Sequence, residues 1–381
     1  MVTYPEDWRE VKLGEALVYT QPTNYIENNY VEHGVVPVLT AGKSFILGYS
    51  DKTDSAYKNL PAILFDDFTT EVRYLDYPFM VKSSATKFLN LKSDYYDIKY
   101  LYYWLDKLKF QIEAHERHWI SRFSKFNIVL PPLAEQQAIA SALSDFDEHI
   151  DNLTELIEKK KAIRDGALED LVSGRTRLDG FNGEWIESTI EDSTKEIITG
   201  GTPSTTVDKY WGGSIPWLAS TEIHQKIITR ATKNITNIGL NNSSAKMAPK
   251  DSVLIALAGQ GKTRGTAAFL AYPMALNQSL AALVAADETD SKFLYYLIEN
   301  MYLELRELSS GDGGRGGLNK TLIKNINIRL PREIKEQHVI AEVLTAMDEE
   351  IESLEVEKEK MLQIKEGSMD DLLTGRVRLK V

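Results

Sequence analysis

The sequence contains no cysteine among its 381 residues. This absence excludes disulfide bonds, thiolate zinc sites and cysteine nucleophiles, and it suits a reducing cytoplasm, where we expect the protein to act. No apolar run is long enough to cross a bilayer, and the first nine residues are polar, unlike a secretory signal peptide. The shares of hydrophobic and charged residues, 43% and 26%, are ordinary for globular domains, and the length accommodates two of them.

Basic residues are fewer than acidic ones, 44 against 56, so the formal net charge is −12. Proteins that bind nucleic acids are usually basic, so this balance argues against DNA binding. The acidic excess is concentrated, however: residues 134–180 hold 6 basic and 11 acidic side chains, and residues 335–381 hold 7 and 12. The rest of the chain carries only −2 and can therefore present a local basic face.

The clearest pattern is an internal duplication. The first copy begins with Phe-Asn-Ile-Val-Leu-Pro at residues 126–131, continues through Glu135-Gln136 and closes with Gly-Arg-Thr-Arg-Leu at 174–178. The second begins with Ile-Asn-Ile-Arg-Leu-Pro at 326–331, continues through Glu336-Gln337 and closes with Gly-Arg-Val-Arg-Leu at 375–379. The shift is 200 residues at the start and 201 at the end, so a single insertion reconciles the copies.

Each copy predicts a long helix. Apolar residues recur at alternating steps of four and three, the spacing of a coiled coil, with charged residues between them. Pro131 and Pro331 precede the helices and Gly174 and Gly375 follow them, as is typical of helix starts and ends. About 35 residues predict a rod of roughly 50 Å. The predicted seam consists of Ile139, Leu143, Phe146, Ile150, Leu153 and Ile157, and of Ile340, Leu344, Met347, Ile351, Leu354 and Met361.

The order of the repeats is circular. Glu6–Trp8 matches Gly183–Trp185, and in the first copy Arg177-Leu178 leads directly into that second start. Arg378-Leu379 is the equivalent point for the first start. If the two halves are equivalent in space, residues near 379 lie beside residues near 6. One helix then leads away from the first domain and the other returns, so we expect an antiparallel, pseudo-two-fold pair.

The remaining chain reads as two mixed domains. Strand-like runs lie at 35–39, 62–65, 252–256 and 280–285, and helical stretches at 100–112 and 293–308. The sequence thus predicts an α+β protein with globular domains at residues 1–133 and 181–334, joined by helical spacers at 134–180 and 335–381. The two domains share the order of strands followed by a helix, but their sequences between these landmarks differ. This combination indicates one scaffold that carries two different recognition surfaces.

Three motifs suggest other chemistry. Residues 256–263 resemble a phosphate-binding P-loop, but Ala256 replaces the first glycine, which the backbone geometry requires. Residues 311–316 fit the letters of a dinucleotide fingerprint but follow a helical stretch, which favours a loop. His115 and His118 are spaced for a metal ion, although a surface loop or a phosphate contact is the favoured interpretation. No Asp- or Asn-Pro-Pro-aromatic motif of an adenine methyltransferase is present, so we expect neither catalysis nor a metal site here.

Together these features resemble the specificity subunits of Type I restriction-modification enzymes over essentially the whole chain. Leu130–Gln136 is similar to the family's Leu-Pro-Pro-x-x-Glu-Gln helix start, and Leu330–Gln337 is a looser copy that departs at Arg332. Leu171–Gly174 and Leu372–Gly375 are similar to the family's helix ends. The first domain matches less well than the second. Its best landmark is Val36–Thr40, whereas those of the second are Gly200–Ser204, Tyr210-Trp211, Ile215–Trp217, Asn277-Gln278 and Gly317–Lys320.

The resemblance implies a division of labour. Each recognition domain would read one half of a split, asymmetric site in double-stranded DNA. The helices would set the unread spacing and bind two methyltransferase subunits. S-adenosylmethionine would be bound by the methyltransferase, and ATP and Mg by a motor-nuclease restriction subunit if one is present. This chain itself would bind no cofactor and no membrane.

Candidate DNA contacts are polar and basic residues in Gly-rich or aromatic loops. Arg suits guanine, Asn and Gln suit adenine, and Lys more often binds phosphate. By contrast, Trp8, Trp185, Trp211 and Trp217 are predicted to be core or domain-joint residues. The candidates are Thr40, Lys43, Thr69, Arg73, Lys87, Arg117, His118 and Arg122 in the first domain, and Thr202, Ser204, Thr205, Lys262, Arg264, Arg315, Asn319 and Lys320 in the second.

Two other functions stay open at this level. The chain would be a scaffold if its two modules grip other proteins, which the acidic charge favours; selective retention on duplex DNA excludes this. A P-loop hydrolase predicts ATP turnover that Lys262→Ala abolishes, and we expect no turnover.

Overall fold

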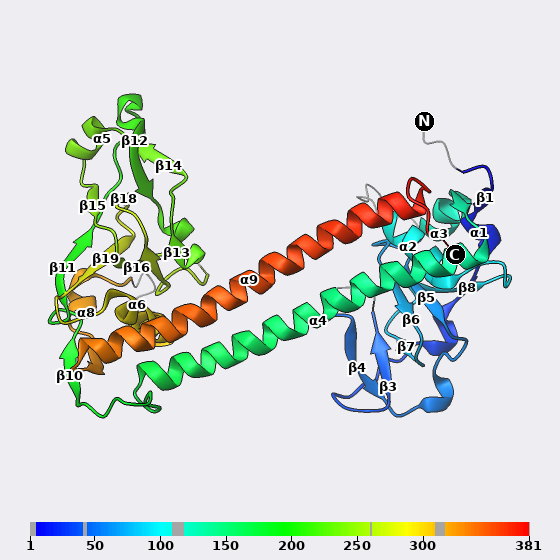
Figure 1. The fold of residues 1–381 in the computed structure, drawn as a ribbon, viewed down its shortest axis with the longest axis horizontal. Helices are drawn as coiled ribbons and strands as arrows, with labels where there is room; N and C mark the ends of the chain where they lie inside the picture. Colours follow the sequence, from blue (N-terminus) through cyan, green and yellow to red (C-terminus); the bar gives the residue numbers. More distant parts are fainter. Residues whose placement is uncertain (1–4, 41–43, 109–117, 260, 309–316, 381) are drawn as a thin grey trace. The chain divides into compact units, whose positions relative to one another are not determined.

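In a computed structural model, the chain folds into two compact units, which contain residues 1–155 with 355–381 and residues 156–354 (Figure 1). The structure describes residues 5–40, 44–108, 118–259, 261–308 and 317–380. The boundary between the units divides both long helices near their middle. By compactness, each half of a helix groups with a globular part. The helical spacers at residues 134–180 and 335–381 stay a prediction of the sequence pattern.

The first unit is built on a four-stranded antiparallel sheet in the order β2-β8-β5-β6. In β5, Ile63 and Phe65 face a core shared with α2, whereas Ala62 and Leu64 face a second sheet. Burial on both faces explains the continuous apolar run. The strands are β1 (Arg9–Lys12), β2 (Leu17–Thr20), β3 (Val36–Leu39), β4 (Ile46–Ser50), β5 (Ala62–Asp66), β6 (Val72–Leu75), β7 (Met80–Val81), β8 (Thr86–Leu91) and β9 (Asn127–Leu130), and the short helices are α1 (Leu13–Ala16), α2 (Ile98–Lys107) and α3 (His118–Ser121).

The second unit repeats this plan. Its main sheet has the order β11-β19-β16-β17-β13, and a second sheet has the order β14-β12-β18-β15. The strands are β10 (Trp185–Thr189), β11 (Thr194–Thr199), β12 (Trp211–Leu218), β13 (Ile227–Ile228), β14 (Lys233–Ile235), β15 (Lys246–Ala248), β16 (Ser252–Ala256), β17 (Ala267–Leu270), β18 (Met274–Leu276), β19 (Leu280–Ala285) and β20 (Asn327–Pro331). The short helices are α5 (Asn237–Asn241), α6 (Ser291–Asn300), α7 (Tyr302–Leu308) and α8 (Lys320–Lys324).

The two long helices, α4 (Leu133–Val172) and α9 (Ile334–Leu373), have 40 residues each. Each is thus roughly 60 Å long, more than the predicted 50 Å. Each is followed shortly by a glycine with a φ of 71°, Gly174 or Gly375, a conformation that favours glycine after a helix. None of the described helices is long and apolar enough to cross a membrane.

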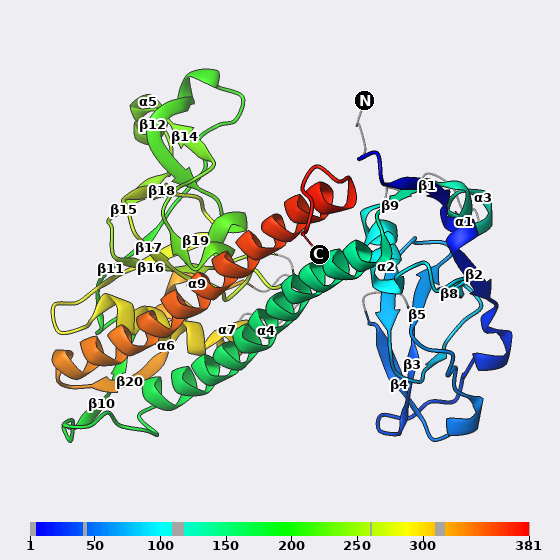
Figure 2. The same ribbon diagram turned by 45° about the vertical axis from the view of Figure 1, so that its right-hand side comes forward.

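Within each unit the helices run antiparallel, as predicted (Figures 1 and 2). In the first unit Asp147 pairs with Lys365 and His149 with Glu357; in the second, Lys160 pairs with Glu350 and Arg164 with Asp348. Residue numbers rise along one helix as they fall along the other.

The predicted seam residues divide into two groups. Ile139 and Leu143 pack into the core of the first globular part with α2, and Ile340 and Leu344 pack into that of the second with α6. The first turns of each long helix thus serve a globular core. Ile150, Leu153, Ile157 and Ile351 are also buried, whereas Phe146, Met347, Leu354 and Met361 are half-buried.

Two predicted helical stretches differ from the structure. The first ends at Lys107, and the rest of the predicted span up to 112 lies largely outside the described residues. The second is broken into α6 and α7 at Met301, whose N–H donates to the carbonyls of both Leu297 and Ile298. The bifurcated bonds mark a tightened turn, which apolar spacing does not reveal.

The circular order of the repeats is confirmed by matching contacts in the two units. Arg177 forms two hydrogen bonds to Glu336, at 2.6 and 2.8 Å, and lies over the ring of Trp185. Arg378 likewise bonds both carboxylate oxygens of Glu135 at 2.6 Å and lies over Trp8. Arg378 also bonds Asp7 at 2.8 and 3.0 Å, which lowers the pKa of that carboxyl. Residues 375–378 therefore close on residues 5–8.

Candidate nucleic-acid interface

In the second unit, three loops meet at one edge of the main sheet. The β-ladders pair Thr199 with Ala281 and Ala256 with Leu280. The loop after β11, the loop from β16 to β17 and the segment before β19 therefore lie at the same edge. The N–H of Leu257 donates to the carbonyl of Ser279 at 2.8 Å, and that of Leu318 donates to the carbonyl of Leu257 at 3.0 Å. The start of α8 thus joins the edge; we call these four segments (200–206, 257–266, 277–279 and 317–320) the second loop edge.

The described candidates of the second domain all lie on this edge. Thr202, Ser204, Thr205, Lys262, Asn319 and Lys320 are exposed and Arg264 is half-buried, while Arg315 lies outside the described residues. The side chain of Asn319 also caps α8 by accepting the N–H of Leu322 at 2.9 Å. The structure therefore places residues from distant parts of the sequence on loops that leave the same edge of the sheet, with hydroxyl, amide and cationic groups suited to reading and holding DNA.

Sequence reasoning missed one member of this edge. Gln278 is exposed, and its side-chain carbonyl accepts a hydrogen bond from the hydroxyl of Thr202. A glutamine amide suits the major-groove edge of adenine. The signal was present, because Gln278 stands in the Asn277-Gln278 landmark, but nothing in the sequence placed it beside Thr202.

Close packing fixes the backbone of the loop that carries Thr202. A Cβ on Gly200 would lie 1.9 Å from the carbonyl oxygen of Leu276, and one on Gly201 would lie 1.9 Å from the hydroxyl of Ser244. The indole N–H of Trp217 donates to the carbonyl of Gly201 at 3.0 Å. Because Trp217 is buried, the loop is anchored to the core, and the expectation that this Trp is structural fits its position.

Trp8 and Trp185 are buried as well, whereas Trp211 is half-buried. The ring of Trp211 lies edge-on to that of Trp217, with centroids 5.1 Å apart. Its indole N–H donates to the carbonyl of Ser204 at 3.1 Å, which ties the loop of Ser204 to β12.

The first unit has an equivalent loop edge. The ladders pair Asp66 with Thr86 and Thr20 with Phe88, so the loops 67–71 and 82–85 lie together. Thr69 is exposed in the first loop, where its N–H donates to the side chain of Asp66 at 2.8 Å. Thr40 is half-buried and follows Leu39, whose carbonyl accepts the N–H of Lys82 at 3.0 Å. Arg122 is exposed just after α3, and Lys43 and Arg117 lie outside the described residues.

Three other candidates of the first domain are placed unlike surface contacts. Lys87 and His118 are each 1% exposed, and Lys87 pairs with Asp67 at 3.2 Å. The backbone N–H of His118 donates to the carbonyl of Asp67, just as that of Leu318 donates to the carbonyl of Leu257 in the second unit. The side chain of His118 is buried, as is that of Leu318. Arg73 lies on β6 over the ring of Phe45. Residue type suggested contact, but burial and strand position depend on the tertiary fold, so Lys87, His118 and Arg73 are not members of the candidate interface.

The P-loop-like segment has a different structure from a phosphate-binding loop. It connects β16 to β17, which pair antiparallel, so it is a hairpin loop with no following helix. The hydroxyl of Thr263 bonds His224 at 3.1 Å, and Arg306 donates to the carbonyl of Gly261 at 2.6 Å. Residues 311–316 and His115 lie outside the described residues. In the part of the chain that is described, no group of three or more His, Asp or Glu is arranged to hold a metal ion.

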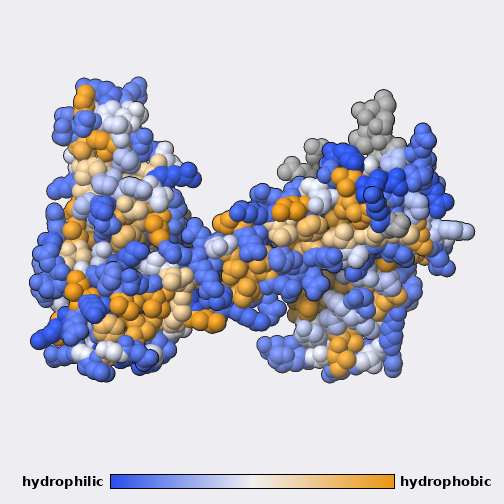
Figure 3. Space-filling view, viewed as in Figure 1, coloured by the Kyte–Doolittle hydropathy of each residue, from blue (hydrophilic) through white to orange (hydrophobic). Residues whose placement is uncertain are grey.

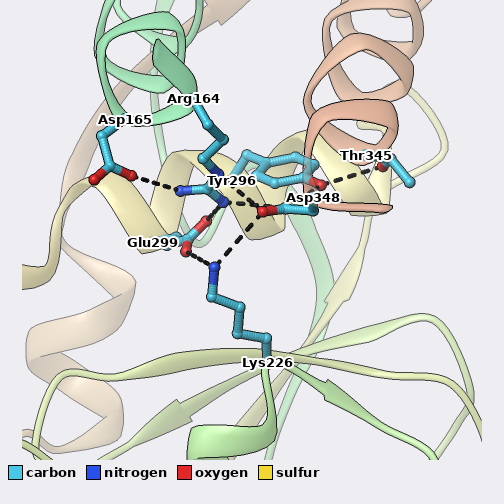
Figure 4. A network of polar contacts seen from close by, with 7 residues as sticks. All are labelled: Arg164, Asp165, Lys226, Tyr296, Glu299, Thr345 and Asp348. Atoms are coloured by element: carbon cyan, nitrogen blue, oxygen red, sulfur yellow. Dashed lines mark hydrogen bonds and ion pairs between the residues drawn. The ribbon is translucent and has the colours of Figure 1, made fainter. Parts of the chain in front are cut away.

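A polar network joins the second globular part to the long helices (Figure 4). Arg164 of α4 bonds Asp348 of α9 at 3.0 and 3.1 Å and also Glu299 of α6. The hydroxyl of Tyr296 donates to Asp348 at 2.9 Å, and the ammonium of Lys226 lies 3.6 Å from Asp348 and 3.7 Å from Glu299. Arg164 is only 4% exposed, so this joint is desolvated and held by paired charges.

Comparisons with known proteins agree with this architecture. The family model of the Type I restriction modification DNA specificity domain matches residues 5–162 and again residues 182–363. The chain is 30% identical over 346 residues, 88% of this chain and 85% of the relative, to the Type I restriction enzyme EcoR124I/EcoR124II specificity subunit of Escherichia coli. It is 24% identical to the Type I restriction enzyme MjaVIII specificity subunit of Methanocaldococcus jannaschii, over 99% of this chain and 94% of the relative.

Solved structures show the same fold. The S subunit of a Type I restriction-modification system from M. genitalium aligns with a TM-score of 0.67 and 18% identity over 96% of both chains. A chain from a structure of Type I R-M complex assembly and conformational transition aligns with a TM-score of 0.59 and 16% identity, over 98% of this chain and all of that one. With two matched domains, the protein belongs to the family of Type I restriction-modification DNA specificity subunits, which supply sequence recognition and not catalysis.

Proposed function

We propose that the two loop edges read the two halves of a split, asymmetric DNA site, and that the exposed residues named above make the contacts. The observation that carries this proposal is that equivalent frames present equivalent loop edges with different side chains: Thr202, Gln278 and Lys262 on one, Thr69 and Arg122 on the other. One frame with two different surfaces would read two different half-sites.

We also propose that the chain positions two copies of a methyltransferase subunit, which bind S-adenosylmethionine and methylate adenine, with a motor-nuclease restriction subunit using ATP and Mg where one is present. Exposed apolar residues on the long helices support a protein partner there: Leu156 and Ile163 on α4, and Val356 and Ile364 on α9. Figure 3 shows apolar surface over these helices. Their acidic charge also suits protein better than phosphate. Because its target is host and incoming DNA, we place the protein in the cytoplasm.

The test is co-expression with a methyltransferase subunit of the same restriction-modification system, followed by sequencing of host DNA for N6-methyladenine. The expected result is a split motif with a fixed gap. Replacing Thr202 and Gln278 together by Ala should change or relax only one half of that motif, by about 1–3 kcal/mol of discrimination per lost base contact. An unchanged motif would remove these residues from the proposed interface.

A protein-binding scaffold is the second candidate, and the net charge of −12 is the observation that favours it. The two candidates differ in salt-dependent retention on duplex DNA, which a reader shows because its cationic contacts release counterions. Stable complex formation without DNA retention or methylation would move the assignment to the scaffold.

A further inference from the structure

The internal duplication allows each position in the first unit to be compared with its equivalent in the second. Gln136 and Gln337 both accept the N–H of an Asp that caps a helix, Asp97 for α2 and Asp290 for α6. Tyr103 of α2 donates to Asp147 of α4 at 2.7 Å, and Tyr296 of α6 donates to Asp348 of α9 at 2.9 Å. By these registers, Asp106 is equivalent to Glu299 and Lys365 to Arg164.

The outermost strand on one side of the main sheet differs between the units; this lateral edge is distinct from the loop edges described above. In the second unit β13 pairs parallel with β17, and the N–H of Phe269 donates to the carbonyl of Lys226 at 2.7 Å. In the first unit β6 takes the place of β17, and the ladders make Tyr74 the equivalent of Phe269. Among the residues that the structure describes, no strand pairs with the outer edge of β6. The place of β13 is therefore not taken by a strand of the described chain.

A cavity of about 810 Å³ lies at this edge. Its lining includes both Arg73 and Tyr74, which are successive residues of β6 and so point to opposite faces of the sheet. A cavity that both of them line must run along the edge of the strand. Asp106 and Asp147 also line it. In the second unit Lys226 contacts Phe269, Glu299 and Asp348, and the equivalents of all three line this cavity.

The position of Lys226 gives the chemistry of an occupant. Its backbone carbonyl pairs with the sheet edge while its ammonium lies between two carboxylates, with a φ of 58° that directs the chain into β13. Around the first-unit cavity, Glu148 and Asp151 add two further exposed acidic side chains to its wall. Three cations line it as well: Lys365, which takes the place of Arg164 and pairs with Asp147, and Arg73 and Lys99, which lie over the rings of Phe45 and Tyr74. None of these three takes the place of Lys226. The site therefore suits an extended peptide that adds a strand to β6 and places a Lys or Arg among the carboxylates.

We propose that this occupant is an extended segment of the methyltransferase subunit, which adds a strand parallel to β6 and inserts a basic side chain beside Asp147. The inference rests on the proposed function, because it takes the methyltransferase as the partner. It makes the two halves of the chain unequal: the second completes its own sheet, whereas the first is completed by the partner.

The test places the photo-crosslinking residue p-benzoylphenylalanine at Phe45 or at Arg73, which both line the cavity, in the assembled methyltransferase complex. The expected result is a covalent adduct with the methyltransferase subunit. Mass spectrometry should locate it in an extended segment that contains Lys or Arg. An adduct within the same chain, or with a second copy of it, overturns the proposal.

Charge reversal supplies the matched control. Glu148→Lys with Asp151→Lys should lower the adduct yield at Phe45 by roughly tenfold, because the basic side chain meets like charge. Glu349→Lys with Glu352→Lys changes the equivalent positions of the second copy and should leave that yield unchanged. No adduct at either position in a complex that co-elutes and methylates DNA refutes the docking alone. Failure to co-elute or to methylate refutes the proposed function and the inference with it.

Discussion

At the scale of single residues, the joints between the globular parts and the long helices depend on buried carboxylates. Glu135 and Glu336 are each 1% exposed and each accepts two hydrogen bonds from one arginine. Glu336 also accepts the indole N–H of Trp185 at 3.3 Å. A buried carboxylate without its cation is costly, so the arginine is needed to keep this joint closed.

We predict that Arg177→Ala lowers the free energy of unfolding of the second unit by about 2–3 kcal/mol, because it leaves Glu336 buried without its cation. This loss is smaller than that expected for a fully buried ion pair, because the side chain of Arg177 is 30% exposed. Urea denaturation of the full-length chain, followed by tryptophan fluorescence, measures it. Arg175→Ala is the control: Arg175 pairs with Glu169 on the surface, where a salt bridge contributes about 0–1 kcal/mol. Equal losses for the two variants would contradict the prediction.

A pH dependence is expected at His338. Its hydrogen bond to Asp290, at 3.0 Å, raises the pKa of the imidazole above 6.5, with a further contribution from Glu342. A raised pKa in the folded state means that the stabilisation is fully present below pH 6.5 and is lost as the pH rises through the folded-state pKa. His338→Gln should therefore destabilise the protein more at pH 6 than at pH 8.5 in urea denaturation. A difference that is constant with pH would rule out this ion pair as the cause.

At the scale of elements, the start of each long helix is fixed to a neighbouring helix by one glutamine. Gln337 is fully buried; it accepts the N–H of Asp290 at 2.8 Å and donates to the carbonyls of Glu288 and Pro331 at 3.1 and 2.8 Å. Gln136 makes the same contacts with Asp97, Tyr95 and Pro131. Three backbone groups from two segments therefore depend on one amide.

We predict that Gln136→Ala lowers the free energy of unfolding of the first unit by about 2–3 kcal/mol, because buried backbone groups lose their partners. Hydrogen exchange of the first turn of α2 should increase at the same time. Gln137→Ala, at the exposed neighbouring position, is the control and should change stability by less than about 0.5 kcal/mol. If Gln136→Ala and Gln137→Ala had the same free energy of unfolding, the side-chain amide of Gln136 would not hold the helix start in place.

At the scale of the whole molecule, the circular repeat leaves the first unit to be closed by contacts of residues 375–378 with residues 5–8. A Cβ on Gly375 would lie 2.7 Å from the ring of Pro5, as one on Gly174 would lie 3.1 Å from Trp185. Arg378 and Trp8 repeat the contact of Arg177 and Trp185, although Arg378 and Trp8 are far apart in the sequence and no short connection joins them.

We predict that a circular permutant keeps the fold and the DNA specificity. Direct fusion of Val381 to Met1 leaves 10 residues between Arg378 and Trp8, compared with 7 between Arg177 and Trp185, so no linker is needed. New ends between Asp179 and Gly180 fall in an exposed connection. Methylation of the same motif by the permutant complex tests this, whereas ends opened between Gln136 and Gln137, inside α4, should abolish assembly. Loss of methylation in the permutant opened between Asp179 and Gly180 would contradict the prediction.

The sequence by itself determined the repeat, the two long helices, the α+β composition and the antiparallel order, because these follow from local periodicity and from matches along the chain. The landmark Gly200–Ser204 also placed the candidates Thr202 and Ser204 correctly on a loop. Only the tertiary structure decided which of them share an edge and which are buried. Lys87 and His118 are polar by type, but whether a side chain reaches the surface depends on strand register and on neighbours distant in sequence, as for Lys87 and Asp67. The unequal sheet edges beside β6 and β17 were likewise set by pairing between remote segments, which no local pattern encodes.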